Sequence, residues 1–314
     1  MTWRETDKLW AGADSDDDAV IVRMPNGELL ATTVDIITPL VNDPYLFGQL
    51  AAANSLSDIF AMGGTPIFAM SVLGFQSGQI SSKTVAAVLQ GAADKAAEVG
   101  VVMAGGHTIS NSEMLFGLAC VGKVEEGAIL RKDGLDPGDL LILTKPIGTG
   151  LVGAAHKQGL LDEHSYSTWS AWLSRLNNVA AQAALVAGAK SATDITGFGL
   201  LGHLWEMVNR SGVTARIWLD AVPLMPKARE YAAMGLAPGG TKRNLKFVEP
   251  HTRFDDSVGE VGKLLLCDAQ TSGGLLIALK EGMLAPFSNH CSRHGQEYWV
   301  IGHVEAGHPE LVVT

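Results

Sequence analysis

Residues 32–64, TTVDIITPLVNDPYLFGQLAAANSLSDIFAMGG, decide how the first half of the chain folds. Their start continues an apolar, β-branched run and predicts a strand with Asp35 at its end. Asp43 then indicates a helix N-cap, with Pro44 at the first helical position, where the N–H that proline lacks would have no partner. The helix is expected to end at Gly63. A strand leading into a long helix is typical of mixed α/β proteins.

The alternation of strand-like and helical runs continues outward from this stretch. Ser82 begins a second helix that Gly100 ends, and an apolar strand near 140–145 opens the second half. Further helices are expected near 150–158 and 167–187. No Pro/Ser-rich linker or low-complexity tract separates the halves. We therefore expect an α/β (α+β) fold of two packed domains. The expected domains are 1–145 and 146–314.

The composition supports two domains and excludes several classes of protein. A chain of 314 residues is long enough for about two domains of ~150 residues. Its 47% hydrophobic and 18% charged residues argue against disorder and against a coiled coil. The formal net charge of −10 argues against a nucleic-acid binder that clamps phosphates by bulk positive charge. It leaves open a phosphate site in which carboxylates hold a cation.

The cysteines and the apolar runs indicate the compartment. Cys120, Cys267 and Cys291 form no CxxC pair, which excludes a disulfide scaffold and a structural zinc site and fits a reducing compartment. The first residues are polar and acidic, and no apolar run reaches the ~18 residues of a membrane helix. We therefore expect a cytoplasmic protein that contacts neither membrane nor nucleic acid.

Four acidic positions are candidate functional sites, and two of them lie in the first 35 residues. Asp16, Asp17 and Asp18 are adjacent carboxylates ahead of a strand, and such groups repel one another unless solvent or a cation screens them. They form either a solvated acidic turn or part of an oxygen-rich Mg²⁺ site. Asp35 ends its strand, where a carboxylate either points into a cleft or forms a turn.

Asp58 has the strongest functional signal of the acidic residues. It follows Asn54 by four residues in the expected helix, so both polar groups lie on one helix face. Because the rest of that helix is rich in Ala, Leu, Ile and Phe, Asp58 should be buried, and a buried carboxylate without a partner is costly. Either a metal or a hydrogen bond must therefore satisfy it.

Glycines accompany the remaining candidates. Asp194 precedes Gly197 and Gly199, which would let a ligand approach the start of the next helix closely, and plain helix capping is the alternative. The stretches 105–108 and 271–274 each contain two adjacent glycines that either cradle a phosphate or turn the chain. Neither stretch matches the Walker or the dinucleotide-binding pattern.

Single polar residues add weaker candidates. His107 and His203 are candidates for acid–base chemistry, with a hydrogen-bonded structural role as the alternative. Lys145, before a proline, is either structural or a phosphate contact. Cys120 and Cys267 lie in apolar runs, so their thiols should be buried and inert.

Taken in order, these motifs resemble one family along essentially the whole chain: selenophosphate synthetase (selenide, water dikinase), within the aminoimidazole-ribonucleotide synthetase superfamily. A series of ordered motifs is far more specific than any single one. The matching stretches are DDDAV at 16–20, the whole of 32–64, AGGHTI at 104–109, LTKPIGTG at 143–150, TDITGFGLLGHL at 193–204, APGGTKRN at 237–244 and CDAQTSGGLL at 267–276.

The resemblance implies a fold, a reaction and a set of site residues. The fold is aminoimidazole-ribonucleotide-synthetase-like, with an N-terminal sheet that pairs with a second copy into a dimer barrel. The reaction converts ATP, selenide and water into selenophosphate, AMP and phosphate with Mg²⁺. The implied metal ligands are Asp17, Asp58 and Asp194. The implied ATP contacts are Asp16, Asp35, Asp58, Gly106, His107 and Thr108, the last three supplied by the partner of a homodimer.

The chain departs from the family pattern near its start. The family carries a glycine-rich N-terminal arm with a reactive Cys or selenocysteine and a nearby Lys. Here the 16 residues before Asp17 contain no Cys, and Lys8 lies in no such motif. We therefore assign no catalytic residue, expect an arm that is truncated or missing, and expect selenide turnover to be lost or very weak without it. The alternatives are a non-catalytic, nucleotide-binding paralogue and a superfamily kinase with another small substrate.

Overall fold

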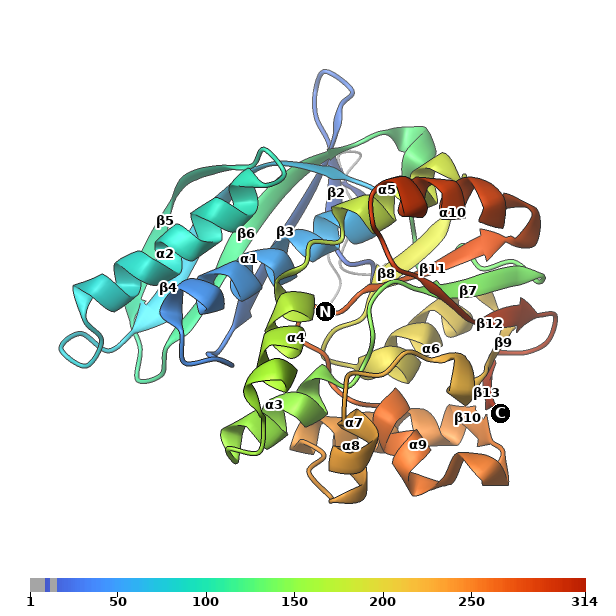
Figure 1. Cartoon of the computed structure of the whole chain (residues 1–314). Coiled ribbons are helices and arrows are strands. Elements are labelled where there is room, and N and C mark those ends of the chain that lie inside the picture. Colours follow the sequence, from blue (N-terminus) through green and yellow to red (C-terminus); the bar gives the residue numbers. More distant parts are fainter. Residues whose placement is uncertain (1–8, 12–15) are drawn as a thin grey trace. The chain divides into compact units, whose positions relative to one another are not determined.

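The computed structural model describes residues 9–11 and 16–314, with only the backbone for 9–11 (Figure 1). The chain divides into two compact units. Unit 1 comprises Met1–Ile129 and Ser174–Asn178, and unit 2 comprises Leu130–Leu173 and Val179–Thr314. The domain boundary at 145/146 stays a prediction. Lys8, and with it the stretch on which the expected loss of the arm depends, lies outside the described residues.

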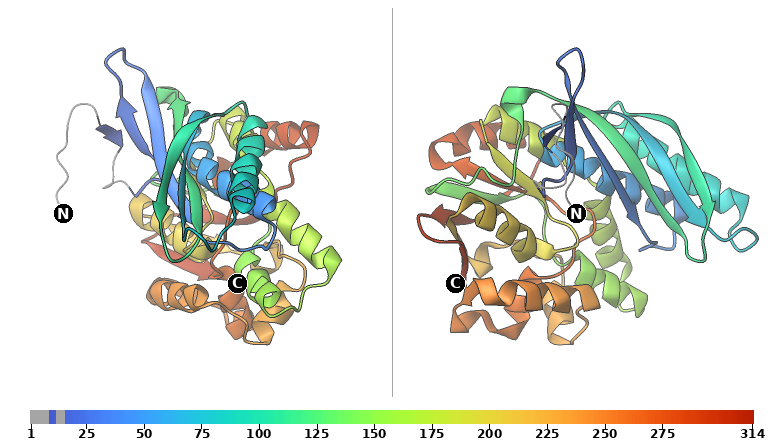
Figure 2. Two further views of the ribbon diagram at one scale, coloured as in Figure 1. Left: turned by 90° about the vertical axis from the view of Figure 1, so that its left-hand side faces the viewer. Right: turned by 180° about the vertical axis from the view of Figure 1, so that it is seen from behind.

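Unit 1 is built on a six-stranded mixed sheet in the order β1-β2-β3-β6-β4-β5. Strands β4 and β5 pair in parallel, and the other neighbours are antiparallel. Helices α1 and α2 lie together on one face of the sheet (Figures 1 and 2). The bounds are β1 Leu9–Ala11, β2 Val20–Arg23, β3 Leu29–Ile37, α1 Pro44–Ala61, β4 Thr65–Phe75, α2 Ser82–Ala97, β5 Val102–Ser110, β6 Leu115–Val124 and the short 3-10 helix η2 Glu126–Ala128.

The start of α1 confirms the helix boundary predicted from Asp43 and Pro44. The Asp43 carboxylate accepts hydrogen bonds from the N–H groups of Tyr45 (2.9 Å) and Leu46 (3.2 Å), and Pro44 is the first helical residue. Gly63, with a φ of 74°, follows the helix end as expected. Most of α1 is buried, because the sheet covers one side of the helix and α2 covers another.

Unit 2 is built on a seven-stranded mixed sheet in the order β10-β13-β9-β12-β7-β11-β8. Helix α6 packs on β9 and β13, and α5 and α10 lie on the opposite side of the sheet (Figure 1). The two sheets confirm the expected α/β (α+β) class. The bounds are β7 Asp139–Leu143, α3 Thr149–Lys157, α4 Glu163–Ser174, α5 Asn178–Val186, β8 Ser191–Asp194, α6 Gly199–Ser211, β9 Thr214–Ile217, η3 Leu219–Ala221, α7 Ala228–Ala233, α8 Gly239–Val248, η4 Glu249–His251, β10 Thr252–Phe254, η5 Asp256–Val258, α9 Gly259–Leu266, β11 Leu275–Lys280, η6 Glu281–Met283, α10 Leu284–Arg293, β12 Trp299–Glu305 and β13 Glu310–Val313.

The single helix expected over 167–187 is wrong. Helix α4 ends at Ser174 and α5 begins at Asn178, and the residues between them belong to unit 1. There the Asn177 side chain donates a hydrogen bond to Ser57 Oγ of α1 at 2.9 Å. A contact with a residue so distant in sequence overrides local helix propensity.

The helices give no sign of a membrane-spanning segment. In the part of the chain that the structure describes, no helix combines the length and the apolar character needed to cross a bilayer.

Candidate functional site

The clearest polar cluster of unit 1 lies between α1 and β3. Asn54 and Asp58 are one turn apart on α1, and Thr33 and Asp35 share one face of β3. The Thr33 hydroxyl donates to Asp58 Oδ2 at 2.5 Å, and the Asn54 amide donates to Asp35 Oδ2. Asp58 is half-buried, less buried than expected, and the hydrogen bond from Thr33 gives it the partner that burial requires.

The Asp35 carboxylate is held from several sides. The Ile36 N–H donates to its Oδ1 at 2.8 Å. Ser55 Oγ accepts from the Leu118 N–H at 3.0 Å and lies 2.9 Å from the Asp35 carbonyl oxygen, which ties α1 to β3 and β6. Burial raises the pKa of Asp35, and the hydrogen bonds from Ile36 and Asn54 oppose that rise. These contacts fix the direction in which the carboxylate points.

Asp16, Asp17 and Asp18 precede β2, from which Ala19 separates them. Asp16 is exposed and has a φ of 49°, in the left-handed region, whereas Asp17 and Asp18 are half-buried. Asp194 belongs to unit 2. Among the described residues, no three His, Cys, Asp or Glu side chains form a group that could hold a metal ion. The three-carboxylate Mg²⁺ site therefore stays a prediction.

The glycine stretch of unit 1 forms a strand, so the turn proposed there is wrong. Gly105, Gly106, His107 and Thr108 all belong to β5, an edge strand. A Cβ on Gly106 would lie 2.3 Å from the carbonyl oxygen of Ser71 on β4, so the pairing of the two strands requires glycine there. Gly105, with a φ of 136°, accommodates a bulge opposite β4. His107 and Thr108 are exposed on this edge.

Asp194 is the buried last residue of β8. The chain then passes through Thr196 to α6, which begins at Gly199. Phe198 is the N-cap and no side chain caps the helix, so the alternative in which Asp194 or Thr196 is a plain cap is wrong. Gly199 has a φ of 70°, and a Cβ there would lie 2.8 Å from the carbonyl oxygen of Cys267. Close packing within unit 2 therefore explains this glycine.

The second glycine stretch also packs against neighbouring backbone. A Cβ on Gly273 would lie 2.0 Å from the Ile195 carbonyl oxygen, and a Cβ on Gly274 would lie 2.4 Å from the backbone nitrogen of Lys145. Lys145 is 2% exposed, and its Nζ donates to the Ser272 carbonyl oxygen at 2.8 Å. The structural alternative thus accounts for both glycines and for Lys145.

Two buried polar residues that the sequence did not single out hold the start of α3. Asp268 Oδ2 accepts hydrogen bonds from the N–H groups of Gly150 (2.9 Å) and Leu151 (3.1 Å). Gln270 Oε1 accepts from both the N–H and the hydroxyl of Thr149. Burial raises the pKa of Asp268 to about 6, against the opposing effect of its hydrogen bonds. A carboxylate directly after an apolar run was the signal that could have identified it.

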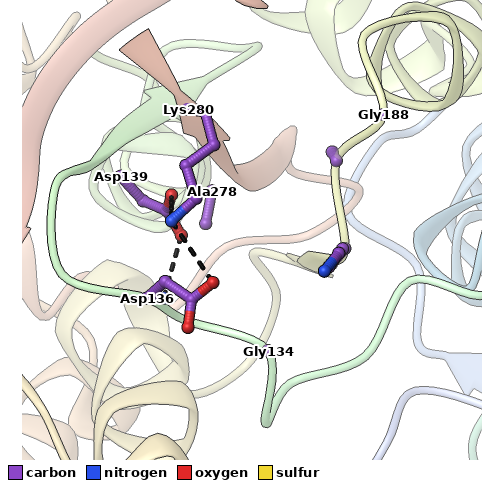
Figure 3. A pocket seen from close by; sticks show the side chains of 8 residues that line it. Gly134, Asp136, Asp139, Gly188, Ala278 and Lys280 are labelled. Carbon is purple, nitrogen blue, oxygen red and sulfur yellow. Dashed lines mark hydrogen bonds and ion pairs between the residues drawn. The ribbon is translucent and has the colours of Figure 1, made fainter.

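A small hollow, open to solvent, lies in unit 2 where β7 begins and β11 ends (Figure 3). Lys280 forms ion pairs there with Asp139 (2.8 Å) and Asp136 (3.2 Å). Neither carboxylate belongs to the predicted site, and both already pair with the same lysine. The other lining residues are Gly134, Gly188, Ala189, Lys190 and Ala278.

Two family models account for most of the chain. The AIR synthase related protein, N-terminal domain, matches residues 16–124, and the corresponding C-terminal domain matches 136–314, which makes this an AIR synthase-related protein. The chain is 43% identical to a selenide, water dikinase of Carboxydothermus hydrogenoformans, over 86% of this chain and 78% of the relative. The like-named protein of Nitratidesulfovibrio vulgaris (strain Hildenborough) is 38% identical, over 99% and 90%. The chain belongs to the selenide, water dikinase family.

Solved structures of the same fold are more distant in sequence. A thiamine-monophosphate kinase from Stenotrophomonas maltophilia K279a has a TM-score of 0.71 at 20% identity, over 98% of this chain and 92% of that one. The hydrogenase maturation protein HypE in complex with ATP has a TM-score of 0.70 at 20% identity, over 90% and 81%. At these identities the likeness concerns the fold alone, and it confirms the expected two-domain architecture.

Proposed function

We propose that the chain is an enzyme that uses ATP, selenide and water to form selenophosphate, AMP and phosphate. The observation that carries this proposal is its membership, along nearly its whole length, of the selenide, water dikinase family. The substrates are accordingly the small molecules ATP and selenide. The non-catalytic paralogue and the kinase of another substrate have no comparable support.

We propose Asp17, Asp58 and Asp194 as the ligands of Mg²⁺. The donors suit this cation, which takes oxygen ligands and is usually held by one or two carboxylates together with phosphate oxygens and waters. At the cluster between α1 and β3, the Thr33 hydroxyl contacts Asp58 and the Asn54 amide contacts Asp35, so the groups present there are polar and oxygen-rich. Bound there, Mg²⁺ would neutralise charge on the triphosphate.

The side chains around the carboxylates would contribute by positioning them. The Thr33 hydroxyl holds Asp58 in one orientation, and the Asn54 amide and the Ile36 N–H hold Asp35. Phosphoryl transfer depends mostly on positioning and on electrostatic stabilisation, so fixed carboxylates are what this reaction needs. The ATP contacts that we propose are Asp16, Asp35, Asp58, Gly106, His107 and Thr108.

We also propose a homodimer through the open face of the six-stranded sheet. Helices α1 and α2 cover the other face (Figure 2). On β3, Val34 and Ile36 alternate with the residues that face α1 and are 61% and 40% exposed. Such a contiguous apolar surface marks a contact surface, and a second copy would cover it. The exposed apolar residues of β4 and β5 are Ile67, Met70, Val102 and Ile109.

We further propose a cytoplasmic setting, supported by the cysteines. All three are buried and unpaired. Burial raises the pKa of both Cys120 and Cys267 to about 12, so these thiols are inert, as expected. Unpaired cysteines are typical of a reducing compartment.

The activity can be tested on the full chain with ATP, selenide and Mg²⁺, by ³¹P NMR of the products. We expect AMP and selenophosphate to form only when selenide and Mg²⁺ are both present, and their formation would overturn the expectation that turnover is lost without the Cys and Lys of the family's N-terminal arm. Asp58→Ala should abolish both products, whereas Asp256→Ala, at an exposed carboxylate of unit 2, should leave them unchanged. Nucleotide binding without AMP formation would contradict the proposal and favour the non-catalytic paralogue.

A further inference from the structure

A buried serine of α1 bridges two strands of the unit 1 sheet beside Asp35. Ser55 is 1% exposed. Its Oγ accepts a hydrogen bond from the Leu118 N–H of β6 at 3.0 Å and donates to the Asp35 carbonyl oxygen of β3 at 2.9 Å. Asp35 and Leu118 are paired residues in the register of these two strands. The hydroxyl therefore lies at a fixed point of the sheet, at the residue proposed to contact ATP.

The single hydroxyl hydrogen of Ser55 has two carbonyl oxygens within reach. Besides that of Asp35, the carbonyl oxygen of Ala51, one turn earlier in α1, lies 2.9 Å from Ser55 Oγ. The Ala51 carbonyl already accepts the helical hydrogen bond from the Ser55 N–H. The N–H of Leu118, opposite Asp35, donates to Ser55 Oγ. The hydroxyl hydrogen is therefore needed most at the Asp35 carbonyl, where it completes a bridge from β6 to β3.

Gly117, which precedes Leu118 on β6, leaves the space that this carbonyl occupies. A Cβ on Gly117 would lie 1.9 Å from the Asp35 carbonyl oxygen and 2.7 Å from the Ile36 Cα. Glycine in a strand commonly marks such a close approach of another backbone. The chain thus provides both the hydroxyl that binds the Asp35 carbonyl and the glycine that admits it.

The Asp35 carbonyl and the Ile36 N–H belong to one peptide group, which is planar and rigid. Fixing the carbonyl therefore also fixes the N–H. That N–H donates to Oδ1 of the Asp35 carboxylate at 2.8 Å, and the Asn54 amide donates to Oδ2. An unbroken series of contacts thus runs from the Ser55 hydroxyl through the peptide group to the carboxylate.

We propose that Ser55 is a positioning residue that holds the peptide group between Asp35 and Ile36 and thereby sets the direction of the Asp35 carboxylate toward ATP. The inference rests on the proposed role of Asp35 as an ATP contact, and all of its residues lie in unit 1. Ser55 is buried and is not assigned to contact the nucleotide. Loss of one such hydrogen bond changes an affinity by about two- to tenfold.

The first test is spectroscopic and needs no ligand. In Ser55→Ala, the amide ¹H resonance of Ile36 should move upfield, because this N–H is held less firmly against the carboxylate. Ser57→Ala is the matched control and should leave the resonance in place. Ser57 is equally buried on α1, and its Oγ accepts from Asn177 at 2.9 Å. A chemical shift reports the folded state, so a mere loss of stability would not move it.

The second test measures the affinity of the full chain for ATP with Mg²⁺ by isothermal titration calorimetry. Ser55→Ala should weaken binding about two- to tenfold, whereas Ser57→Ala should stay within about twofold of the unsubstituted chain. In an Asp35→Ala background, Ser55→Ala should have no further effect, because Ser55 acts through that carboxylate. Ser55→Cys keeps a weaker donor and should lie between serine and alanine in both tests.

The outcomes separate this inference from the proposed function. The inference is overturned, and the proposed function left intact, by an unchanged Ile36 resonance in Ser55→Ala or by equal weakening of ATP binding in Ser57→Ala. A full effect of Ser55→Ala in the Asp35→Ala background would also overturn it. If the unsubstituted chain binds no ATP while the Ile36 resonance still moves, the proposed function fails and Ser55 only orients the carboxylate. If Ser55→Ala does not fold, Ser55→Cys serves for the same comparisons.

Discussion

The Thr33 hydroxyl donates a hydrogen bond to the half-buried carboxylate of Asp58. A hydrogen bond to a charged group contributes about 1.5–3 kcal/mol. Thr33→Val removes the donor while keeping the shape, and we expect kcat/KM for ATP-dependent AMP formation to fall about 10- to 100-fold. Thr33→Ser retains the hydroxyl and should stay close to the unsubstituted chain. Equal activity of the two variants would argue that the orientation of Asp58 does not depend on Thr33.

Asp268 predicts a pH dependence of stability. Its pKa is about 6 in the folded chain, against about 3.9 for an unperturbed Asp, so between these values the folded state binds more protons than the unfolded state. The contribution of Asp268 to the free energy of unfolding is therefore fully present below about pH 4. It is lost as the pH rises through about 6, and the total loss is roughly 3 kcal/mol.

Urea unfolding at a series of pH values between 4 and 7 would measure this dependence. In Asp268→Asn the free energy of unfolding should depend less steeply on pH in this range. The change in slope should correspond to about one bound proton. Asp256→Asn, at an exposed carboxylate, provides the matched control and should leave the slope unchanged. A slope that persists in Asp268→Asn would assign the dependence to another group.

Among the elements, α1 and α2 pack as closely as their glycines allow. A Cβ on Gly48 would lie 2.0 Å from the Val88 carbonyl oxygen, and one on Gly91 would lie 2.0 Å from that of Tyr45. Gly48→Ala should therefore lower the free energy of unfolding by about 1–3 kcal/mol, because the helices must separate. Gly127→Ala meets no atom within 4 Å and should be close to neutral. Denaturant titration would compare the two, and similar midpoints would contradict the close packing.

Local chemistry made some elements predictable, whereas contacts distant in sequence determined others. The N-cap at Asp43 depends on neighbours two and three residues away, so the sequence suffices. The strand at Gly106 depends on Ser71 of β4, and the break before α5 on Ser57 of α1. No local pattern contains these partners. The helix face of Asn54 and Asp58 was predictable from periodicity, but their partners on β3 were not.

At the scale of the whole molecule, the acidic residues of the predicted site are divided between the two units. Hydrogen bonds within unit 1 fix Asp58 and Asp35, and Asp194 is buried at the end of β8 in unit 2. Composition could predict the acidic balance, but only the resemblance to the family linked these carboxylates to one Mg²⁺ and one nucleotide.

The homodimer is the prediction that concerns the molecule as a whole. Val34 of β3 and Val102 of β5 are 61% and 63% exposed. If this face meets a second copy, Val34→Glu with Val102→Glu buries two carboxylates without partners, which costs far more than removing two valine side chains from an apolar interface. Light scattering should then give a mass near 33.1 kDa for the variant and twice that for the unsubstituted chain.

Val186→Glu, at an equally exposed valine of α5 in unit 2, is the matched control and should stay dimeric. AMP formation should fall with the loss of the dimer, since the partner would supply His107 and Thr108 to the nucleotide. A monomeric variant with full activity would separate catalysis from assembly and remove those two residues from the ATP site. If the unsubstituted chain is monomeric at micromolar concentration, the proposed dimer is wrong. The exposed apolar face of the sheet would then serve some other contact.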